Sequence, residues 1–343
     1  MQTKQIGLFV FIASCLFPLE SNAADAPAPA EIRQAVNRSI ALVEKSLAEY
    51  PKHNTCFSCH HQGLGSLALS LARSHGFTID ETTLANIAQH TSADLRLDLE
   101  NYRKGKGQPG GVTRAGYALL ALEFTGTKSD DVTAAVAGFL LDNDKDRGSW
   151  SARSNRPPSE VSPFTNTYLG IRGLKSFGAA ADKEAIAARI AAARLWLEQT
   201  APKDTEDRVF QLWGLKETGA TSANVENAGK ALLALQQLDG GWGQLPGSPS
   251  DAYATGSALT VLRLTGQIAA SDLAYQRGLR YLLQGQLPDG SWHVVSRSKP
   301  VQPYFESGFP HGRDQFISMT ATGWATAALV LSDTKDAKRA ARQ

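Results

Sequence analysis

Cysteine is scarce in this chain of 343 residues, which has only three: Cys15, Cys56 and Cys59. We expect Cys15 to leave with an N-terminal segment, so two cysteines remain, separated by two residues. Two cysteines so close in sequence exclude the disulfide framework that stabilises many small secreted domains. The pair must therefore have a local role.

Long apolar runs and a marked charge excess are also lacking. The one apolar run, residues 6–19, is short for a membrane span, and no later stretch is long enough to cross a bilayer. The formal net charge is only +2, and the basic residues are scattered. The sequence therefore indicates neither nucleic-acid binding nor a transmembrane span in the mature chain.

The first 23 residues resemble a secretory signal. Lys4 gives a positive start, the apolar run follows, and Ser21-Asn22-Ala23 supplies small residues where a signal peptidase reads. We expect cleavage after Ala23 and a periplasmic or secreted protein. A lipoprotein anchored through Cys15 is an alternative, because Ile12-Ala13-Ser14-Cys15 resembles a lipobox.

The rest of the chain predicts one all-α domain over residues 31–333, between a Pro/Ala linker at 24–30 and a basic tail at 334–343. Apolar residues recur at helical spacing, and segments rich in Ala and Leu each close near a glycine. About six helix pairs follow, which is a repeat architecture. The expected first helices are 31–50, 80–100, 130–142, 183–198, 222–238 and 270–284; the second helices are 63–76, 113–126, 164–178, 208–219, 251–266 and 317–332.

The main candidate for chemistry is Cys56-Phe57-Ser58-Cys59-His60. Two cysteines separated by two residues, with histidine directly after the second, form the attachment sequence of c-type haem. Each thiol can add to one vinyl group, and His60 can ligate the iron as proximal ligand. We expect one covalent haem c. The alternatives are a local disulfide or thiol redox pair, and a zinc site of Cys56, Cys59, His61 and a distant histidine.

A second axial ligand would come from elsewhere in the chain. His311 and His293 are candidates because their loop belongs to the last repeat, which would adjoin the first repeat in a closed ring, and His311 is favoured over Met319 of the last inner helix. Asp251, His311 and Asp314 form a possible catalytic constellation, since a histidine between acids can transfer protons. The alternative is that Asp251 and Asp314 only cap helices.

The repeats also resemble a known family. Arg277-Gly278, Gln286 and Gly290-Ser291-Trp292 match the QW repeat of squalene-hopene cyclases and related proteins of the prenyltransferase/squalene-oxidase group. Gln236 with Gly240-Gly241-Trp242 matches half of a repeat, and Gly148-Ser149-Trp150 is a degraded copy. The resemblance implies an α6/α6 toroid in which these residues fasten neighbouring repeats. It also implies that the CxxCH loop and the long loops 101–112, 142–163, 239–250 and 289–315 share one rim.

The resemblance stops at the known active sites. Squalene-hopene cyclases use an acidic DxDD cluster, which we do not find here in a matching inner-helix context, and protein prenyltransferases use a late zinc-binding cysteine, whereas no cysteine follows Cys59. We therefore expect an exported haem toroid that transfers electrons with a redox partner protein, or acts on a bound apolar compound. The alternative is a haem-free toroid that binds or modifies a lipid or glycan, with the two cysteines as a disulfide or zinc site.

Overall fold

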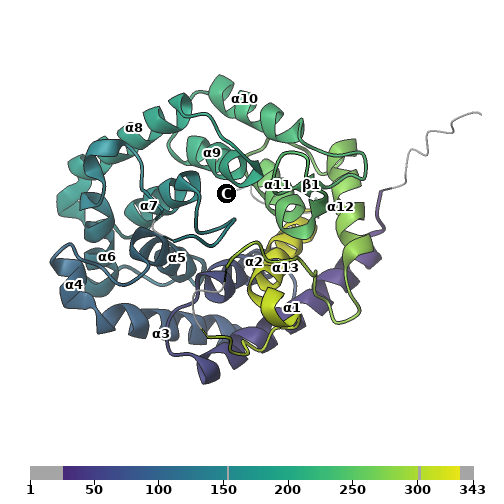
Figure 1. Ribbon diagram of the computed structural model, residues 1–343, viewed down its shortest axis with the longest axis horizontal. Helices are drawn as coiled ribbons and strands as arrows, with labels where there is room; N and C mark the ends of the chain where they lie inside the picture. The colour runs from purple at the N-terminus through teal and green to yellow at the C-terminus, as the bar shows by residue number, and fades with distance from the viewer. Residues whose placement is uncertain (1–25, 153, 300–302, 333–343) are drawn as a thin grey trace, which may run out of the picture.

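The computed structural model describes residues 26–152, 154–299 and 303–332. It contains two concentric rings of helices, and Figure 1 shows the outer ring enclosing the inner one. The predicted all-α toroid is therefore confirmed. The predicted signal peptide and basic tail lie outside the described residues, as does Cys15.

The two rings are built from alternating helices along the chain. Each outer helix is followed by an inner helix, so that inner helices pack against one another and against the outer ring. The outer helices are α1 (Pro29–His53), α3 (Glu81–Leu97) with the short α4 (Leu99–Arg103), α6 (Asp131–Asp142), α8 (Lys183–Gln199), α10 (Ser222–Leu233) and α12 (Leu273–Gly285). The inner helices are α2 (Leu64–Ser74), α5 (Gly111–Phe124), α7 (Pro163–Phe177), α9 (Thr205–Glu217), α11 (Ala252–Leu264) and α13 (Gln315–Val330).

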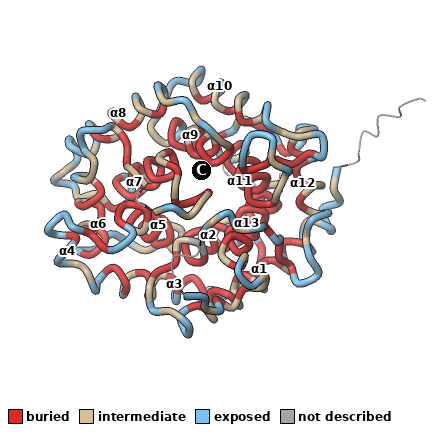
Figure 2. Tube along the Cα trace, in the orientation of Figure 1, coloured by how far each residue is buried: buried red, intermediate tan, exposed pale blue. Residues whose placement is uncertain are grey.

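Burial follows this arrangement. The inner helices are buried over most of their length, whereas the outer helices alternate between buried and exposed residues (Figure 2). Small side chains allow the inner helices to approach closely: a Cβ added at Gly256 of α11 would lie 2.7 Å from the backbone of Trp324 in α13. A helix with no polar face belongs in a core, which is why α13 could be placed on the inner wall from its sequence.

Three tryptophans fasten the repeats in the same way. The indole N–H groups of Trp150, Trp242 and Trp292 donate to the carbonyls of Leu140, Leu232 and Leu282 at the ends of α6, α10 and α12. Their backbone N–H groups donate to threonine hydroxyls of the following inner helices, Thr167, Thr255 and Thr322. The motif therefore ties each outer helix to its inner partner, and Gly148-Ser149-Trp150 is a structural third copy.

The glutamines of the motif join neighbouring repeats. The Gln236 side chain donates to the carbonyls of Gly240 and Ala274, the latter on α12. The Gln286 side chain donates to the carbonyls of Gly290 and Ala35, and the second of these closes the ring from the last repeat to α1. The predicted fastening role is confirmed.

Three local features differ from expectation. Helix α1 continues through Pro51 to His53, because a proline in the last turn removes only one N–H donor and Asn54 still donates to the Tyr50 carbonyl. Helix α9 begins at Thr205 rather than at residue 208, because Asp204 caps it by accepting from the Asp207 N–H. A two-residue antiparallel pair, β1 (Trp242–Gly243) and β2 (Ser250–Asp251), closes the loop before α11.

Aromatic side chains fill the centre of the inner ring. Tyr168 of α7 stacks on Trp213 of α9 with ring centroids 4.3 Å apart, and Trp213 lies 6.0 Å from Trp324 of α13. Phe210 and Tyr253 are buried at the same centre. The space between the inner helices is thus occupied by packed side chains.

None of the helices in the described ranges is both long enough and apolar enough to cross a membrane.

Candidate functional site

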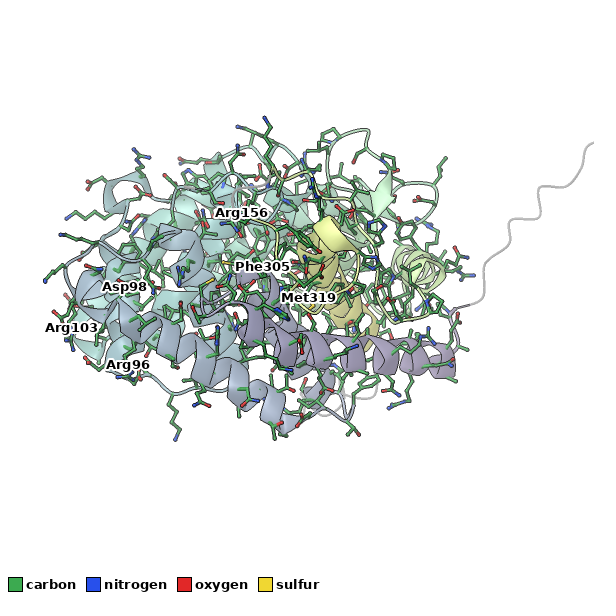
Figure 3. The ribbon with its side chains drawn as sticks, turned by 60° about the horizontal axis from the view of Figure 1, so that its bottom comes forward. Arg96, Asp98, Arg103, Arg156, Phe305 and Met319 are labelled. Atoms are coloured by element: carbon green, nitrogen blue, oxygen red, sulfur yellow. The ribbon has the colours of Figure 1, made fainter. Side chains whose placement is uncertain are left out.

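A cavity of about 670 Å³ opens at the rim where the inner helices begin. The CxxCH loop and the predicted rim loops 101–112, 142–163 and 289–315 line it, together with the first turns of α5 and α13, whereas no described residue of the loop 239–250 is part of the lining. Its wall includes Tyr50, Cys56, Cys59, Thr113, Arg114, Arg156, Glu160, Ser296, Lys299, Tyr304, Phe305, Arg313, Asp314 and Phe316. In Figure 3, Arg156 and Phe305 lie toward the middle of the molecule, whereas Arg96, Asp98 and Arg103 lie at its periphery on or beside outer helices.

The cysteine motif forms one wall of this cavity. Cys56 lies in the loop after α1, and Cys59 begins a five-residue π-helix, Cys59–Gly63, which runs into α2. Ser58 caps this turn by accepting from the His61 N–H at 3.4 Å. Both cysteines are free thiols and half-buried. The motif thus presents both thiols to one cavity.

The two thiols have different surroundings. The Tyr50 hydroxyl lies 3.6 Å from the Cys56 sulfur. Burial raises the pKa of the Cys59 thiol well above its ordinary value, and the nearby Glu160 carboxylate adds to the effect. The side chain of His60 lies outside the described residues. His61 is buried, with its ring 4.9 Å from Tyr50 and 5.7 Å from Phe316.

Charged side chains of both signs also line the cavity. Arg114 of α5 contacts the buried Asp94 carboxylate of α3 at 2.5 Å. Arg156 contacts the buried Glu160 at 3.2 Å. Arg313 of the last loop also reaches the cavity. The lining thus combines aromatic side chains with four cationic residues (Arg114, Arg156, Lys299 and Arg313) and two carboxylates, those of Glu160 and Asp314. The excess of cations suits an apolar ligand that carries carboxylates.

The last loop places the predicted histidines beside the cavity rather than in its wall. His311 and His293 stack with ring centroids 4.7 Å apart. His293 pairs with Asp314 at 2.8 Å, and the His311 ring lies 2.8 Å from the Ser291 hydroxyl. Of these, only Asp314 lines the cavity among the described residues. Burial and the neighbouring His293 lower the pKa of His311.

Asp251 occupies a structural position at the start of α11. Its carboxylate accepts from the Ala254 N–H at 3.0 Å and so caps the helix. Burial raises its pKa. In the described part of the chain, Asp251 makes no hydrogen bond to His311 or Asp314, so the three predicted catalytic residues are not brought into one hydrogen-bonded group. Met319 is fully buried on α13, against Gly65.

An acidic group that we did not expect lies at the start of α9. Asp204-Thr205-Glu206-Asp207 has the spacing of a DxDD cluster, with glutamate in the third place. We missed it because α9 was expected to begin at residue 208, which left these acids in a loop. The N-cap signal of Asp204 could have found it. Glu206 is buried, and burial raises its pKa to about 8.

Glu206 does not reach the cavity. Its carboxylate accepts from the Thr165 hydroxyl at 2.8 Å and the Tyr253 hydroxyl at 3.0 Å. Within the described ranges it is absent from the cavity wall. No group of three or more His, Cys, Asp or Glu side chains is placed to hold a metal ion among the residues that the structure describes.

Comparisons with known proteins support the fold. No family model matches the sequence. Drimenyl diphosphate synthase from Streptantibioticus cattleyicolor is 36% identical over 89 residues, which are 26% of this chain and 15% of that protein. The chain therefore matches only a small part of this curated relative.

Solved structures match nearly the whole chain at low identity. A protein from Actinoplanes has a TM-score of 0.57 at 15% identity, covering 88% of this chain and 99% of that one. The unsaturated glucuronyl hydrolase from Bacillus sp. GL1 has a TM-score of 0.56 at 14% identity, covering 87% and 96%. The type II terpene cyclase MstE from Scytonema, bound to geranylgeranyl dihydroxybenzoate, has a TM-score of 0.52 at 12% identity, covering 89% and 98%. The chain has the α/α-toroid fold that these proteins share.

Proposed function

We propose that the rim cavity holds one haem, attached through thioether bonds from Cys56 and Cys59, and that the protein transfers electrons. The observation that carries this proposal is that both cysteines of the motif line one cavity of about 670 Å³. Such a volume is typical of small-molecule and cofactor pockets, which span roughly 300–1,000 Å³. A disulfide between neighbouring cysteines requires no such hollow.

The composition of the wall supports the same cofactor. Tyr50, Phe305 and Phe316 offer aromatic surface for an apolar macrocycle. Arg114, Arg156 and Arg313 offer guanidinium groups for the two carboxylates that a haem carries. Arg114 is held in place by Asp94, so its position does not depend on the ligand.

The chain's own residues would set the properties of a bound haem. His60 would supply the proximal nitrogen, and His311, His293 or Met319 would have to move toward the cavity to supply a second axial ligand. The aromatic wall would limit water at the macrocycle, a factor that shifts reduction potential. Haem supplies one-electron chemistry when bound. The predicted export signal and a redox partner protein belong to this proposal.

A second candidate is a haem-free binding site in the same cavity. The free thiols of Cys56 and Cys59 would then form a disulfide or bind zinc, and the cavity would take a lipid or glycan. The lining supports an apolar ligand with an anionic end. The terpene cyclase and the glucuronyl hydrolase of the same fold act on an isoprenoid compound and on a glycosaminoglycan respectively, which favours these ligand classes.

The deciding experiment is a pyridine haemochrome spectrum with an intact mass. The protein is exported from a host with a cytochrome c maturation system. We expect a c-type spectrum and one added haem mass, both lost in the Cys56→Ala/Cys59→Ala variant and kept in a His53→Ala control, whose histidine is exposed on the same segment. Protein without haem under these conditions overturns the first candidate, and zinc analysis with thiol titration then tests the second.

A further inference from the structure

A buried carboxyl group lies outside the lining of the rim cavity but is connected to it through residues of α5 and α7. Glu206 stands in the first turn of α9, where Thr165 of α7 and Tyr253 of α11 both donate to it. It is 3% exposed, so water does not solvate its charge. The proposed haem site makes no use of this group.

Two sets of contacts connect the lining of the cavity with the surroundings of Glu206. Thr113, which lines the cavity, donates to the Asn166 side chain at 2.9 Å, and Asn166 is the next residue to Thr165. Tyr117 lies one helical turn below Thr113 and packs against Gly63 of the CxxCH turn. The Tyr117 phenol is close enough to both Glu206 and Cys59 for each to raise its pKa, although burial is the larger cause.

A hydrogen-bond donor without a partner in the described part of the chain lies among these connecting residues. The Asn166 amide nitrogen is buried and has no hydrogen-bond partner among the described residues. Buried polar groups are normally hydrogen-bonded. This donor belongs to the residue next to Thr165, which itself donates to Glu206.

The groups that face Glu206 cannot neutralise its charge. On its own helix they are the carboxyl groups of Asp204 and Asp207, and on α11 and α5 they are the phenols of Tyr253 and Tyr117. Thr165 on α7 carries no charge. Glu206 is consequently protonated at neutral pH, since burial raises its pKa to about 8.

We propose that Glu206 is the proton-uptake site of this protein and takes up one proton when the haem is reduced in alkaline solution, an inference that rests on the proposed haem site. One electron from a reduced redox protein converts ferric to ferrous iron, and one proton from water converts the Glu206 carboxylate to the acid. In alkaline solution, where Glu206 is ionised in the ferric protein, the charge added at the cavity is compensated by the proton that Glu206 takes up.

The direction of the coupling follows from electrostatics. An added electron disfavours a nearby carboxylate, so the pKa of Glu206 is higher in the ferrous than in the ferric protein. A unit charge about 10 Å away changes proton affinity by roughly tenfold at an effective dielectric constant of about 20. A tenfold change corresponds to about 59 mV for a one-electron couple. The reduction potential therefore falls as pH rises through the Glu206 titration.

The test is spectroelectrochemical titration of the haem protein between pH 6 and pH 10. We expect the wild-type midpoint potential to fall by about 59 mV over the titration, and the Glu206→Gln variant to lose this fall. Glu217→Gln is the matched control: it changes the same residue type on the same helix at the opposite rim, where Arg172 and Lys175 pair with it. We expect the midpoint potential of Glu217→Gln to fall with pH as that of the wild type does.

Infrared difference spectroscopy of the wild type gives a second readout, which does not require the variant to fold. Reduction should produce a protonated carboxyl band near pH 8. A haem protein whose potential is independent of pH in this range, or whose pH dependence survives Glu206→Gln, overturns the inference and leaves the haem site standing. If the protein fails to acquire haem, both this inference and the proposed haem site are overturned.

Discussion

The phenol oxygen of Tyr50 lies 3.6 Å from the sulfur of Cys56, whereas Cys59 faces the carboxylate side of the cavity near Glu160. The two thiols of the motif therefore differ in environment although only two residues separate them. Burial raises the pKa of Cys59, and a thiolate is the species that reacts with electrophiles.

The haem-free protein should show this difference in its thiol chemistry. Iodoacetamide alkylation at pH 8 is measured on Cys56→Ser, which leaves Cys59, and compared with a free-thiol peptide of the same local sequence. We expect Cys59 to react at least about tenfold more slowly than the peptide, because each unit of raised pKa removes tenfold of the thiolate. Equal rates would contradict the buried environment assigned to Cys59. Unfolding in urea should remove the difference.

The glycine of the last QW turn sets how tightly the ring closes. Gly290 has φ +92°, and a Cβ there would lie 2.6 Å from the carbonyl of Arg38 in α1. Gly76 has φ +76° with nothing within 4 Å. Gly76→Ala should cost only the penalty of the left-handed conformation, about 1–2 kcal/mol.

Gly290→Ala should cost distinctly more in the free energy of unfolding, because the α1 backbone must also shift. Urea unfolding of the two variants beside the wild type measures both costs. A Gly290→Ala cost no greater than that of Gly76→Ala would mean that α1 yields easily and that the ring is not closed tightly at this turn.

The ion pair between Arg114 and Asp94 should contribute far more to the free energy of unfolding than an ion pair on the outer surface. Asp94 has a side chain only 2% exposed and Arg114 one 18% exposed. Asp94→Ala leaves a buried guanidinium without its carboxylate, so we expect a loss of about 3 kcal/mol in unfolding free energy. The exposed pair of Arg103 and Asp131 provides the control, and Asp131→Ala should cause no measurable loss. Chemical denaturation of both variants tests this, and equal losses would contradict it.

The sequence predicted the toroid because its signals are local and repeated. Helical periodicity and the Gly-x-Trp turns mark each repeat, and the hydrogen bonds of Trp292 and Gln286 have the fastening role expected of them. The rim position of the cysteine motif followed from the same repeat order. These features depend on residues near one another in the chain.

What the sequence did not predict depends on side chains from different repeats. Glu206 stands in an acidic run whose spacing resembles a DxDD cluster, but its burial depends on the approach of Thr165 and Tyr253 from two other helices. Pairings across the ring leave no spacing signal.

The buried acid makes a prediction about stability that is independent of haem. An ordinary glutamate in the unfolded chain has a pKa of about 4.3, and burial raises that of Glu206 to about 8 in the folded protein. At pH values between these two pKa values, Glu206 keeps its proton in the folded state but has lost it in the unfolded state. Stability must therefore fall as pH rises across this window, and level off above it.

Glu206→Gln removes that proton linkage while keeping the shape of the side chain. We expect the free energy of unfolding of the wild type to fall with pH relative to the variant, by up to about 1.4 kcal/mol per pH unit from this one group. Urea unfolding of haem-free protein at pH 5.5, 6.5 and 7.5 gives the two curves. Glu217→Gln is again the control. Arg172 and Lys175 lower the pKa of Glu217 despite its burial, so the unfolding free energy of this variant should change with pH in parallel with that of the wild type over this range. If the pH dependence of the unfolding free energy were the same in Glu206→Gln and the wild type, Glu206 would be ionised in the folded protein. The hydrogen bonds from Thr165 and Tyr253 would then be sufficient to stabilise a buried carboxylate.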